Sequence, residues 1–77
     1  MNEKDTFKLC VINPNTSEAM TKQIYLAAKS IASPNTKITC TNPRFGPESI
    51  EGFYDEAFCV PGIIEEIEKN QDSEAYI

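Results

Sequence analysis

Residues 7–17 read Phe-Lys-Leu-Cys-Val-Ile-Asn-Pro-Asn-Thr-Ser, an almost continuous apolar run that changes abruptly into a polar loop. The run over residues 7–12 is typical of a strand buried on both faces, as in the centre of a parallel sheet. Residues 13–17 end that strand and supply several candidate helix N-caps. Asn15, with Glu18 three residues later, matches a capping box. The segment therefore predicts a central strand that leads directly into a helix.

The apolar residues after this loop recur at helical spacing. One stripe of an amphipathic helix is formed by Met20, Ile24, Ala27, Ala28 and Ile31. Lys22 and Lys29 fall on the opposite face, and the Ser-Pro-Asn of residues 33–35 ends the helix.

A second strand and a second helical stretch follow. Residues 37–41 alternate polar and apolar side chains, with Ile38 and Cys40 on one side, which predicts a strand with one solvated face at a sheet edge. After a loop over residues 42–47, a helical stripe is predicted for Ile50, Phe53, Tyr54, Ala57 and Phe58. The Pro-Gly pair at 61–62 predicts a kink or break, then a short helix to about Lys69. Residues 75–77 open a third strand.

The order β-α-β-α-β predicts one α/β domain over residues 1–77 with a parallel sheet. Residues 7–12 are apolar on both faces whereas residues 37–41 alternate, so the first strand is expected between the other two, in the order 2-1-3. Residues 1–6 are expected to be disordered. Because a third strand opens in the last three residues, we expect the chain to be a fragment of a longer fold.

The composition excludes several classes of function. The 77 residues include 7 basic and 12 acidic residues, for a net charge of −5, and no histidine. Basic residues are scattered singly, so neither a nucleic acid nor an anionic membrane is expected as a partner. The longest apolar run is too short to cross a bilayer, and the charged N-terminus is unlike a signal peptide. Three cysteines without a CxxC pair fit neither a disulfide framework nor a zinc site, so we expect a reducing cytoplasm.

Two loops follow strands where ligands bind in open α/β sheets, beyond the carboxyl ends of the strands and close to helix N-termini. The first loop, residues 13–17, offers carboxamides, hydroxyls and free N–H groups that suit a carboxylate or an imide. The second loop, residues 46–51, brings Gly46 and Pro47 to a tight approach and places Ser49 near a helix start. The simpler alternative for both loops is that their residues only cap helices and turn the chain.

The other reactive side chains favour structural roles. No histidine or third ligand accompanies the carboxylates, which we expect on solvated helix faces: Glu48, Glu51, Asp55, Glu56, Glu65, Glu66 and Glu68. Cys10 and Cys40 lie in mid-strand and are expected to act as small buried hydrophobes, whereas the role of Cys59 near a helix end stays open.

Taken together, two motifs resemble the N-terminal part of the aspartate/glutamate/hydantoin racemase family, in its hydantoin and allantoin racemase branch. The first is Ile-Asn-Pro-Asn-Thr-Ser at residues 12–17, followed by Met20 and Thr21, and the second is Gly-Pro-Glu-Ser-Ile-Glu at residues 46–51. The pair is specific, whereas either motif alone is weak. The resemblance extends over nearly the whole chain, from about Phe7 to Ile77.

The resemblance implies a cofactor-independent racemase of hydantoins or amino-acid derivatives, built from two flavodoxin-like α/β lobes that face a small-molecule substrate across a cleft. This chain then corresponds to a three-layer half-lobe. Two cysteines, one from each lobe, take and return the substrate proton from opposite sides. The substrate pocket is implied to be lined by Asn13, Pro14, Asn15, Thr16, Ser49 and Ile50.

The sequence departs from the family pattern at its cysteines. Cys10, Cys40 and Cys59 match neither catalytic cysteine, so no catalytic residue is expected within this chain. We expect it to be inactive alone and marginally folded, with self-association or a need for a complementing chain. The alternative is a flavodoxin-like binding or structural remnant without catalysis.

Overall fold

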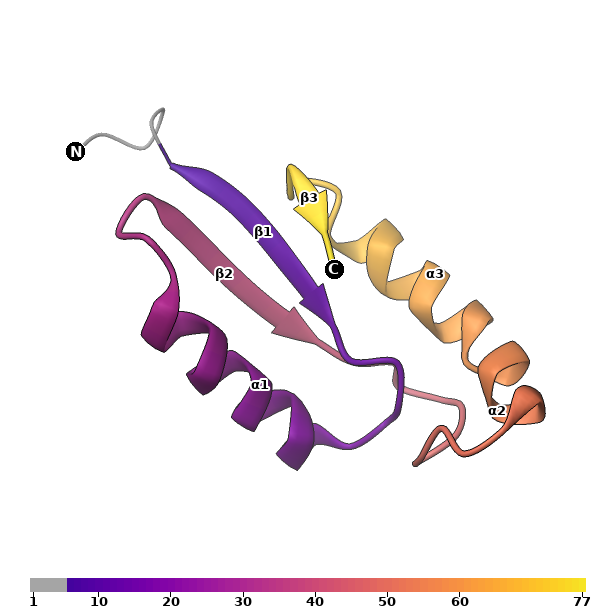
Figure 1. Cartoon of the computed structure of the whole chain (residues 1–77). Helices are drawn as coiled ribbons and strands as arrows, with labels where there is room; N and C mark the ends of the chain where they lie inside the picture. Colours follow the sequence, from indigo (N-terminus) through magenta and orange to yellow (C-terminus); the bar gives the residue numbers. More distant parts are fainter. Residues whose placement is uncertain (1–5) are drawn as a thin grey trace.

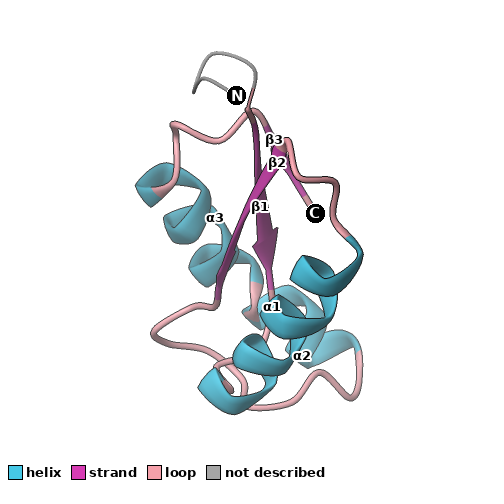
Figure 2. Cartoon of the chain, turned by 90° about the vertical axis from the view of Figure 1, so that its left-hand side faces the viewer, coloured by secondary structure: helices cyan, strands magenta, loops and turns pink. Residues whose placement is uncertain are grey.

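The computed structural model describes residues 6–77, in which a parallel sheet lies between helices on its two sides (Figure 1, Figure 2). The predicted α/β class is confirmed. The strands are β1 (Phe7–Ile12), β2 (Thr36–Thr41) and β3 (Ala75–Tyr76). The helices are α1 (Glu18–Ile31), α2 (Phe53–Phe58) and α3 (Val60–Lys69). Of residues 1–6, predicted to be disordered, only Thr6 lies within the described residues, and it precedes β1 without regular secondary structure.

The strand order β2-β1-β3 confirms the predicted sheet. β1 pairs with β2 over its whole length, from Phe7 to Ile12, and pairs with β3 at Leu9 and Cys10. Cys10, in the middle of the central strand, is 0% exposed. A strand with neighbours on both edges and helices on both faces needs an apolar run, which is the pattern of residues 7–12.

Alternate residues of β1 face different helices. Leu9 and Val11 line an apolar groove of about 360 Å³ beneath α1, together with Ile38 of β2. Cys10 faces the other side of the sheet, where α3 contributes Glu66. The alternation in β2 is also as predicted, since Ile38 is half-buried while its neighbour Thr39 is exposed.

The N-terminus of α1 is capped by a different residue from the one predicted. Ser17 is the N-cap, and its hydroxyl accepts a hydrogen bond from the Met20 amide at 3.1 Å. The capping box that the sequence indicated at Asn15 is therefore wrong. The Asn15 carboxamide instead turns back toward the loop, where its oxygen accepts from the Ser17 amide at 2.9 Å.

The predicted apolar stripe of α1 is only partly buried. Met20 is 48% exposed and Ile31 87% exposed, and Ala27 is exposed as well, so the expectation fails at both ends of the stripe and at one position between them. The buried residue of this helix is Thr21. The reason is that α1 packs mainly against β2, and a single strand covers a narrower strip of the helix than the stripe occupies.

The chain breaks between α2 and α3 at Cys59, as the Pro-Gly pair predicted. Pro61 lies in the first turn of α3, where a helix tolerates a residue without an N–H. α2 begins at Phe53 rather than near Ile50, and its aromatic stripe is not buried: Phe53 is 90% exposed and Tyr54 78%. This six-residue helix packs on α3 and not on the sheet.

The acidic residues of α3 differ in environment. Glu66, expected on a solvated face, is only 4% exposed, so that expectation is wrong. Its carboxylate accepts a hydrogen bond from the Thr41 hydroxyl at the end of β2 and lies 3.4 Å from Lys69 Nζ. Glu65 forms a two-point ion pair with Arg44, at 2.7 and 3.0 Å. Both glutamates tie α3 to the end of β2 and the loop after it.

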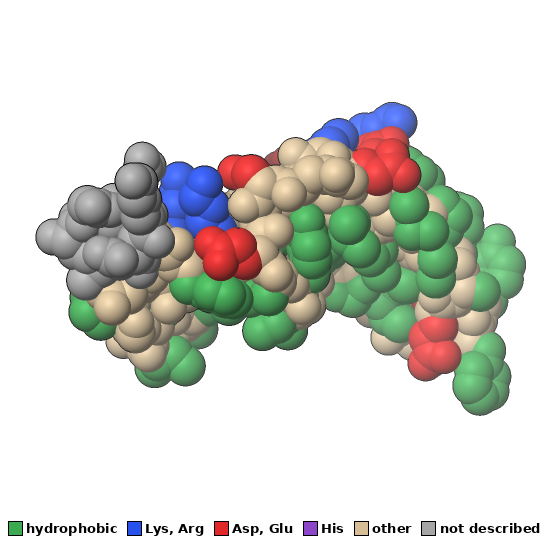
Figure 3. All heavy atoms as spheres, turned by 90° about the horizontal axis from the view of Figure 1, so that it is seen from above, with side chains coloured by type: hydrophobic (Ala, Val, Ile, Leu, Met, Phe, Trp, Pro, Cys, Tyr) green, Lys and Arg blue, Asp and Glu red, His purple; other side chains and the backbone are tan. Residues whose placement is uncertain are grey.

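The described residues form an elongated body. The radius of gyration is 13.4 Å, against about 11.5 Å for a compact domain of this length. Figure 3 shows hydrophobic side chains spread over much of one face. No helix within residues 6–77 has the length and apolar character needed to cross a membrane.

Candidate functional site

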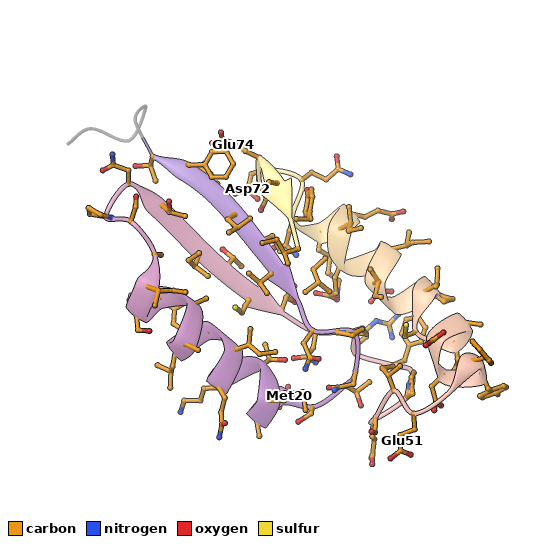
Figure 4. The ribbon with its side chains drawn as sticks, viewed as in Figure 1. Met20, Glu51, Asp72 and Glu74 are labelled. Carbon is orange, nitrogen blue, oxygen red and sulfur yellow. The ribbon has the colours of Figure 1, made fainter. Side chains whose placement is uncertain are left out.

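The two loops singled out in the sequence lie side by side at the carboxyl end of the sheet. The first runs from Asn13 to Ser17 and leads into α1, and the second follows β2. In Figure 4, Met20 at the start of α1 and Glu51 in the second loop lie at the same end of the molecule, away from Asp72 and Glu74. Backbone hydrogen bonds join the loops to their neighbours: Asn13 N donates to Thr41 O at 2.9 Å, and Thr16 N donates to Pro47 O at 3.1 Å.

Asn13 forms the buried base of the first loop, with 3% exposure. Its Nδ2 lies within hydrogen-bond distance of three acceptors: Asn15 Oδ1 at 2.8 Å, Thr21 Oγ1 at 3.1 Å and Ser17 O at 3.3 Å. Its Oδ1 accepts from the Asn15 amide at 3.4 Å. The Asn13 side chain is thus fully engaged within the protein, and its role is to shape the loop.

The orientation of the Asn15 carboxamide is set by its neighbours. Asn13 Nδ2 and the Ser17 amide both donate to Asn15 Oδ1, and only the oxygen of a carboxamide can accept them. Its Nδ2 therefore points the other way, 3.2 Å from the sulfur of Met20. A thioether is a weak acceptor, so this N–H₂ group retains donor capacity for a ligand.

Thr21 and Asn42 complete the polar network, and the sequence analysis assigned a role to neither. Thr21 Oγ1 accepts from Asn13 and can donate to Asn42 Oδ1 at 2.8 Å or Ser17 O at 3.0 Å. Asn42 Nδ2 donates to Pro43 O at 3.0 Å. Two signals in the sequence point to Thr21: it follows the first loop in the motif noted above, and it stands at helical spacing with Ile24 and Ala28, where an apolar residue is usual.

The predicted pocket residues fall into two groups. Asn13 and Asn15 are joined by the hydrogen bonds above, Pro14 is exposed between them, and Thr16 is bonded instead to Pro47 of the second loop. In the second loop, contact with the first is made through Pro47, while Ser49 is exposed and Ile50 half-buried. Ser49 does not cap a helix, because the N-cap of α2 is Gly52, so that alternative interpretation of Ser49 is wrong.

The segment that leads from β2 into the second loop packs closely against α3. Pro43 is fully buried, and a Cβ atom added to Gly62 would lie 2.6 Å from Pro43 Cβ. Gly46 has φ of +121°, a backbone conformation that favours glycine, but a Cβ atom there would meet only Phe58 O at an ordinary 3.9 Å, so the tight approach predicted at Gly46 is not found. The residues that follow Gly46 are thus presented by a fixed loop.

The three thiols differ in their surroundings. All three cysteines are free. Cys10 is completely buried in the central strand. Cys59 Sγ donates to the Glu56 carbonyl at 3.1 Å. Burial raises the pKa of the Cys10 thiol above its ordinary value, and it raises the pKa of Cys40 in the same way. Cys10 is buried as predicted, and Cys40 is half-buried. Within residues 6–77 no group of three potential metal ligands converges.

The arrangement can stabilise negative charge on an oxygen atom. The Asn15 N–H₂ group and the N-terminal end of the 14-residue helix α1 both present positive partial charge at the same loop. Such donors favour a carboxylate, an imide or an enolate-like oxygen over a cation.

The chain is similar to known proteins over most of its length. Residues 9–77 match a family model described as Asp/Glu/Hydantoin racemase. The chain is 54% identical over 65 residues to a hydantoin racemase of Pseudomonas sp. strain NS671, covering 84% of this chain and 26% of that protein. It is 42% identical over 62 residues to a hydantoin racemase of Paenarthrobacter aurescens, covering 80% and 26%.

A solved structure also matches. The allantoin racemase from Klebsiella pneumoniae superimposes with a TM-score of 0.85 at 42% identity, covering 92% of this chain and 30% of that chain. The chain thus spans about a quarter of the length of the curated relatives it matches.

Proposed function

Because the chain belongs to the Asp/Glu/hydantoin racemase family, we propose that it supplies part of the substrate site of an enzyme that racemises hydantoins or related amino-acid derivatives. The observation that carries the proposal is the orientation of Asn15: the residue is 6% exposed, and its N–H₂ group points away from Asn13 and Ser17, toward the sulfur of Met20. Relatives named hydantoin racemase support the substrate class.

The chemistry requires such a donor. Racemisation removes the proton from a carbon next to a carbonyl group, and the electron pair left behind moves onto the carbonyl oxygen. Returning a proton from the other side inverts the centre, so no net oxidation or reduction occurs. Hydrogen-bond donors aimed at the oxygen stabilise the charge as it develops. The Asn15 N–H₂ group, supported by the N-terminus of α1, is the donor we assign to this oxygen.

We assign the remaining pocket residues by their place in the loops. Asn13 orients Asn15, while Pro14 and Thr16 flank it on the exposed side of the same loop. Ser49 and Ile50 contact the substrate from the second loop, which the Thr16–Pro47 hydrogen bond holds alongside the first.

We propose that the two proton-transferring groups are thiols contributed from outside residues 6–77, and that the reaction needs no metal or organic cofactor. The cysteines of this chain are poor candidates, because Cys10 and Cys59 are buried and burial raises the pKa of Cys10 and of Cys40, which favours the protonated thiol. Loss of activity after dialysis against a chelator would contradict the proposal that the reaction needs no metal.

A chimera tests the function. In it, this chain replaces the segment that it matches in the Pseudomonas hydantoin racemase, and racemisation of a chiral hydantoin is followed by polarimetry. A second chimera with the Klebsiella allantoin racemase, assayed on both substrates, distinguishes hydantoin from allantoin as the substrate. Racemisation supports the proposal. A chimera that unfolds cooperatively but leaves the optical rotation unchanged contradicts it and favours the non-catalytic alternative.

We also propose a cytoplasmic location, on the basis of three free cysteines, since a reducing compartment keeps thiols unpaired. Titration of thiols in protein taken directly from cells tests this: three reactive thiols after denaturation support it, and fewer contradict it.

A further inference from the structure

Thr21 is a buried polar residue beside the candidate site, and the proposed function gives it no role. It is 8% exposed, in the first turns of α1, and its hydroxyl group lies between the two loops of the candidate site. A buried hydroxyl on a helix face that packs against a sheet costs free energy unless it is hydrogen-bonded. Here it has partners on both sides.

The partners of this hydroxyl come from the ends of two different strands. On one side it accepts from Asn13 Nδ2 at 3.1 Å, just after β1. On the other it lies 2.8 Å from Asn42 Oδ1, just after β2. Asn13 in turn donates to Asn15 Oδ1 at 2.8 Å, a contact that turns the Asn15 N–H₂ group away from Asn13 and toward Met20.

We propose that Thr21 is a positioning residue: its hydroxyl, held by Asn42, fixes Asn13 and through it the direction in which Asn15 donates to the substrate. The inference rests on the proposed function. Thr21 lies behind the asparagines and acts only through them. Without its hydroxyl, Asn13 Nδ2 keeps only Asn15 Oδ1 at 2.8 Å and the more distant Ser17 O at 3.3 Å as acceptors, so its carboxamide, and Asn15 with it, is held less firmly.

The test compares Thr21→Val, which keeps the shape but removes the hydroxyl, with Thr21→Ser, which keeps the hydroxyl, in the chimera with the Pseudomonas enzyme. Ser30→Ala is the matched control, because Ser30 Oγ donates to Ala27 O at the other end of the same helix. We expect Thr21→Val to lower kcat about 10- to 100-fold with little change in KM. Thr21→Ser should restore most of kcat, and Ser30→Ala should leave it unchanged.

A second variant guards against an effect on folding alone. Asn42→Ala removes the other partner of the same hydroxyl, so the double variant Thr21→Val/Asn42→Ala should lose no more kcat than the stronger single variant. Additive losses, an unchanged kcat in Thr21→Val, or failure of Thr21→Ser to restore activity each overturn the inference.

Hydrogen exchange separates this inference from the proposed function. In the chimera, backbone amides within residues 13–17 should exchange about tenfold faster in Thr21→Val than in Thr21→Ser. A folded but inactive parent chimera contradicts the proposed function, and the exchange rates then still decide whether Thr21 holds the loop. Equal exchange in the two variants overturns that role.

Discussion

Gly62 in α3 lies against the ring of Pro43, so closely that a β-carbon at position 62 would be 2.6 Å from Pro43 Cβ and 3.0 Å from the carbonyl oxygen of Phe45. Neither contact is the far end of a flexible side chain. The loop after β2 is therefore seated directly on the backbone of α3.

We predict that Gly62→Ala destabilises the protein. Forcing a methyl group into this contact costs about 1–3 kcal/mol, and the better helix propensity of alanine offsets at most about 1 kcal/mol. Chemical denaturation of the chimera measures the net loss, expected at about 1–2 kcal/mol. The control is Gly52→Ala, because nothing lies within 4 Å of a β-carbon there. Equal effects of the two substitutions would contradict the role of this contact.

Asn15→Ala should reduce turnover far more than stability. The substitution removes the N–H₂ group assigned to the developing charge, for which losses of about 100- to 1000-fold in kcat are typical. The stability loss is expected near 1 kcal/mol, from the contacts of Asn15 Oδ1 with Asn13 and Ser17. Polarimetry and denaturation of the same chimera give both values. Asn35→Ala, in the exposed turn before β2, is the control. Comparable losses in rate and stability would reduce Asn15 to a loop-forming residue.

The 77-residue chain alone should be only marginally stable. Among the apolar side chains of residues 6–77 only Cys10, Pro43 and Cys59 are buried, while Ile31, Phe53, Tyr54 and Ile77 are each more than three-quarters exposed. The groove of about 360 Å³ beneath α1 leaves further apolar surface in contact with water. We expect broad thermal unfolding by circular dichroism, with self-association in sedimentation or a need for a complementing chain. A sharp, concentration-independent transition of a monomer would refute this expectation.

The isolated chain should also show no racemisation of hydantoins or amino acids. Two-sided proton transfer needs an acid and a base on opposite faces of one carbon, and the thiols of this chain are buried or half-buried. Polarimetry at high protein concentration checks this, with the active chimera as the positive control. Measurable turnover by the chain would show that one of its own groups transfers the proton.

The free energy of unfolding should decline as the pH rises above about 9. Burial raises the pKa of Cys10 above its ordinary value of 9.0, so the folded protein holds this proton at pH values where the unfolded chain has lost it. The resulting stability is present below pH 9 and is lost as the pH rises through the pKa of the folded state. Denaturation between pH 7 and about 10 should show a steeper decline for the parent than for Cys10→Ala. An equal decline in stability with pH in the parent and in Cys10→Ala would contradict the role given to the buried Cys10 thiol.

Much of the backbone was predictable because it depends on local pattern. The apolar run before Asn13, the alternation around Ile38 and the Pro-Gly pair at 61–62 each act through rules of a few residues: strand burial, strand alternation and the missing N–H of proline. The strand order 2-1-3 followed from comparing the first two patterns, and the structure has that order.

The polar network of the candidate site was not predictable in the same way. Asn15 fitted a capping box by spacing, yet Ser17 caps the helix, because the Asn15 oxygen is held by two donors that meet there only when the loop is folded. Thr21 and Asn42 are 21 residues apart and become partners through the pairing of β1 with β2.

The burial of each helix face likewise depended on which other element packs against it. Glu66 has the local pattern of a solvated glutamate, but Thr41 at the end of β2 donates to it and the sheet covers it. The stripe of Phe53 and Tyr54 has the pattern of a buried helix face and remains exposed, since α2 packs mainly on α3 and these two side chains are left uncovered. Local periodicity thus determined which elements form and in what order, because those preferences act within one turn or one strand. Which polar groups meet, and which faces are covered, depended on contacts between segments distant in the chain, which the assembled sheet and helices alone bring together.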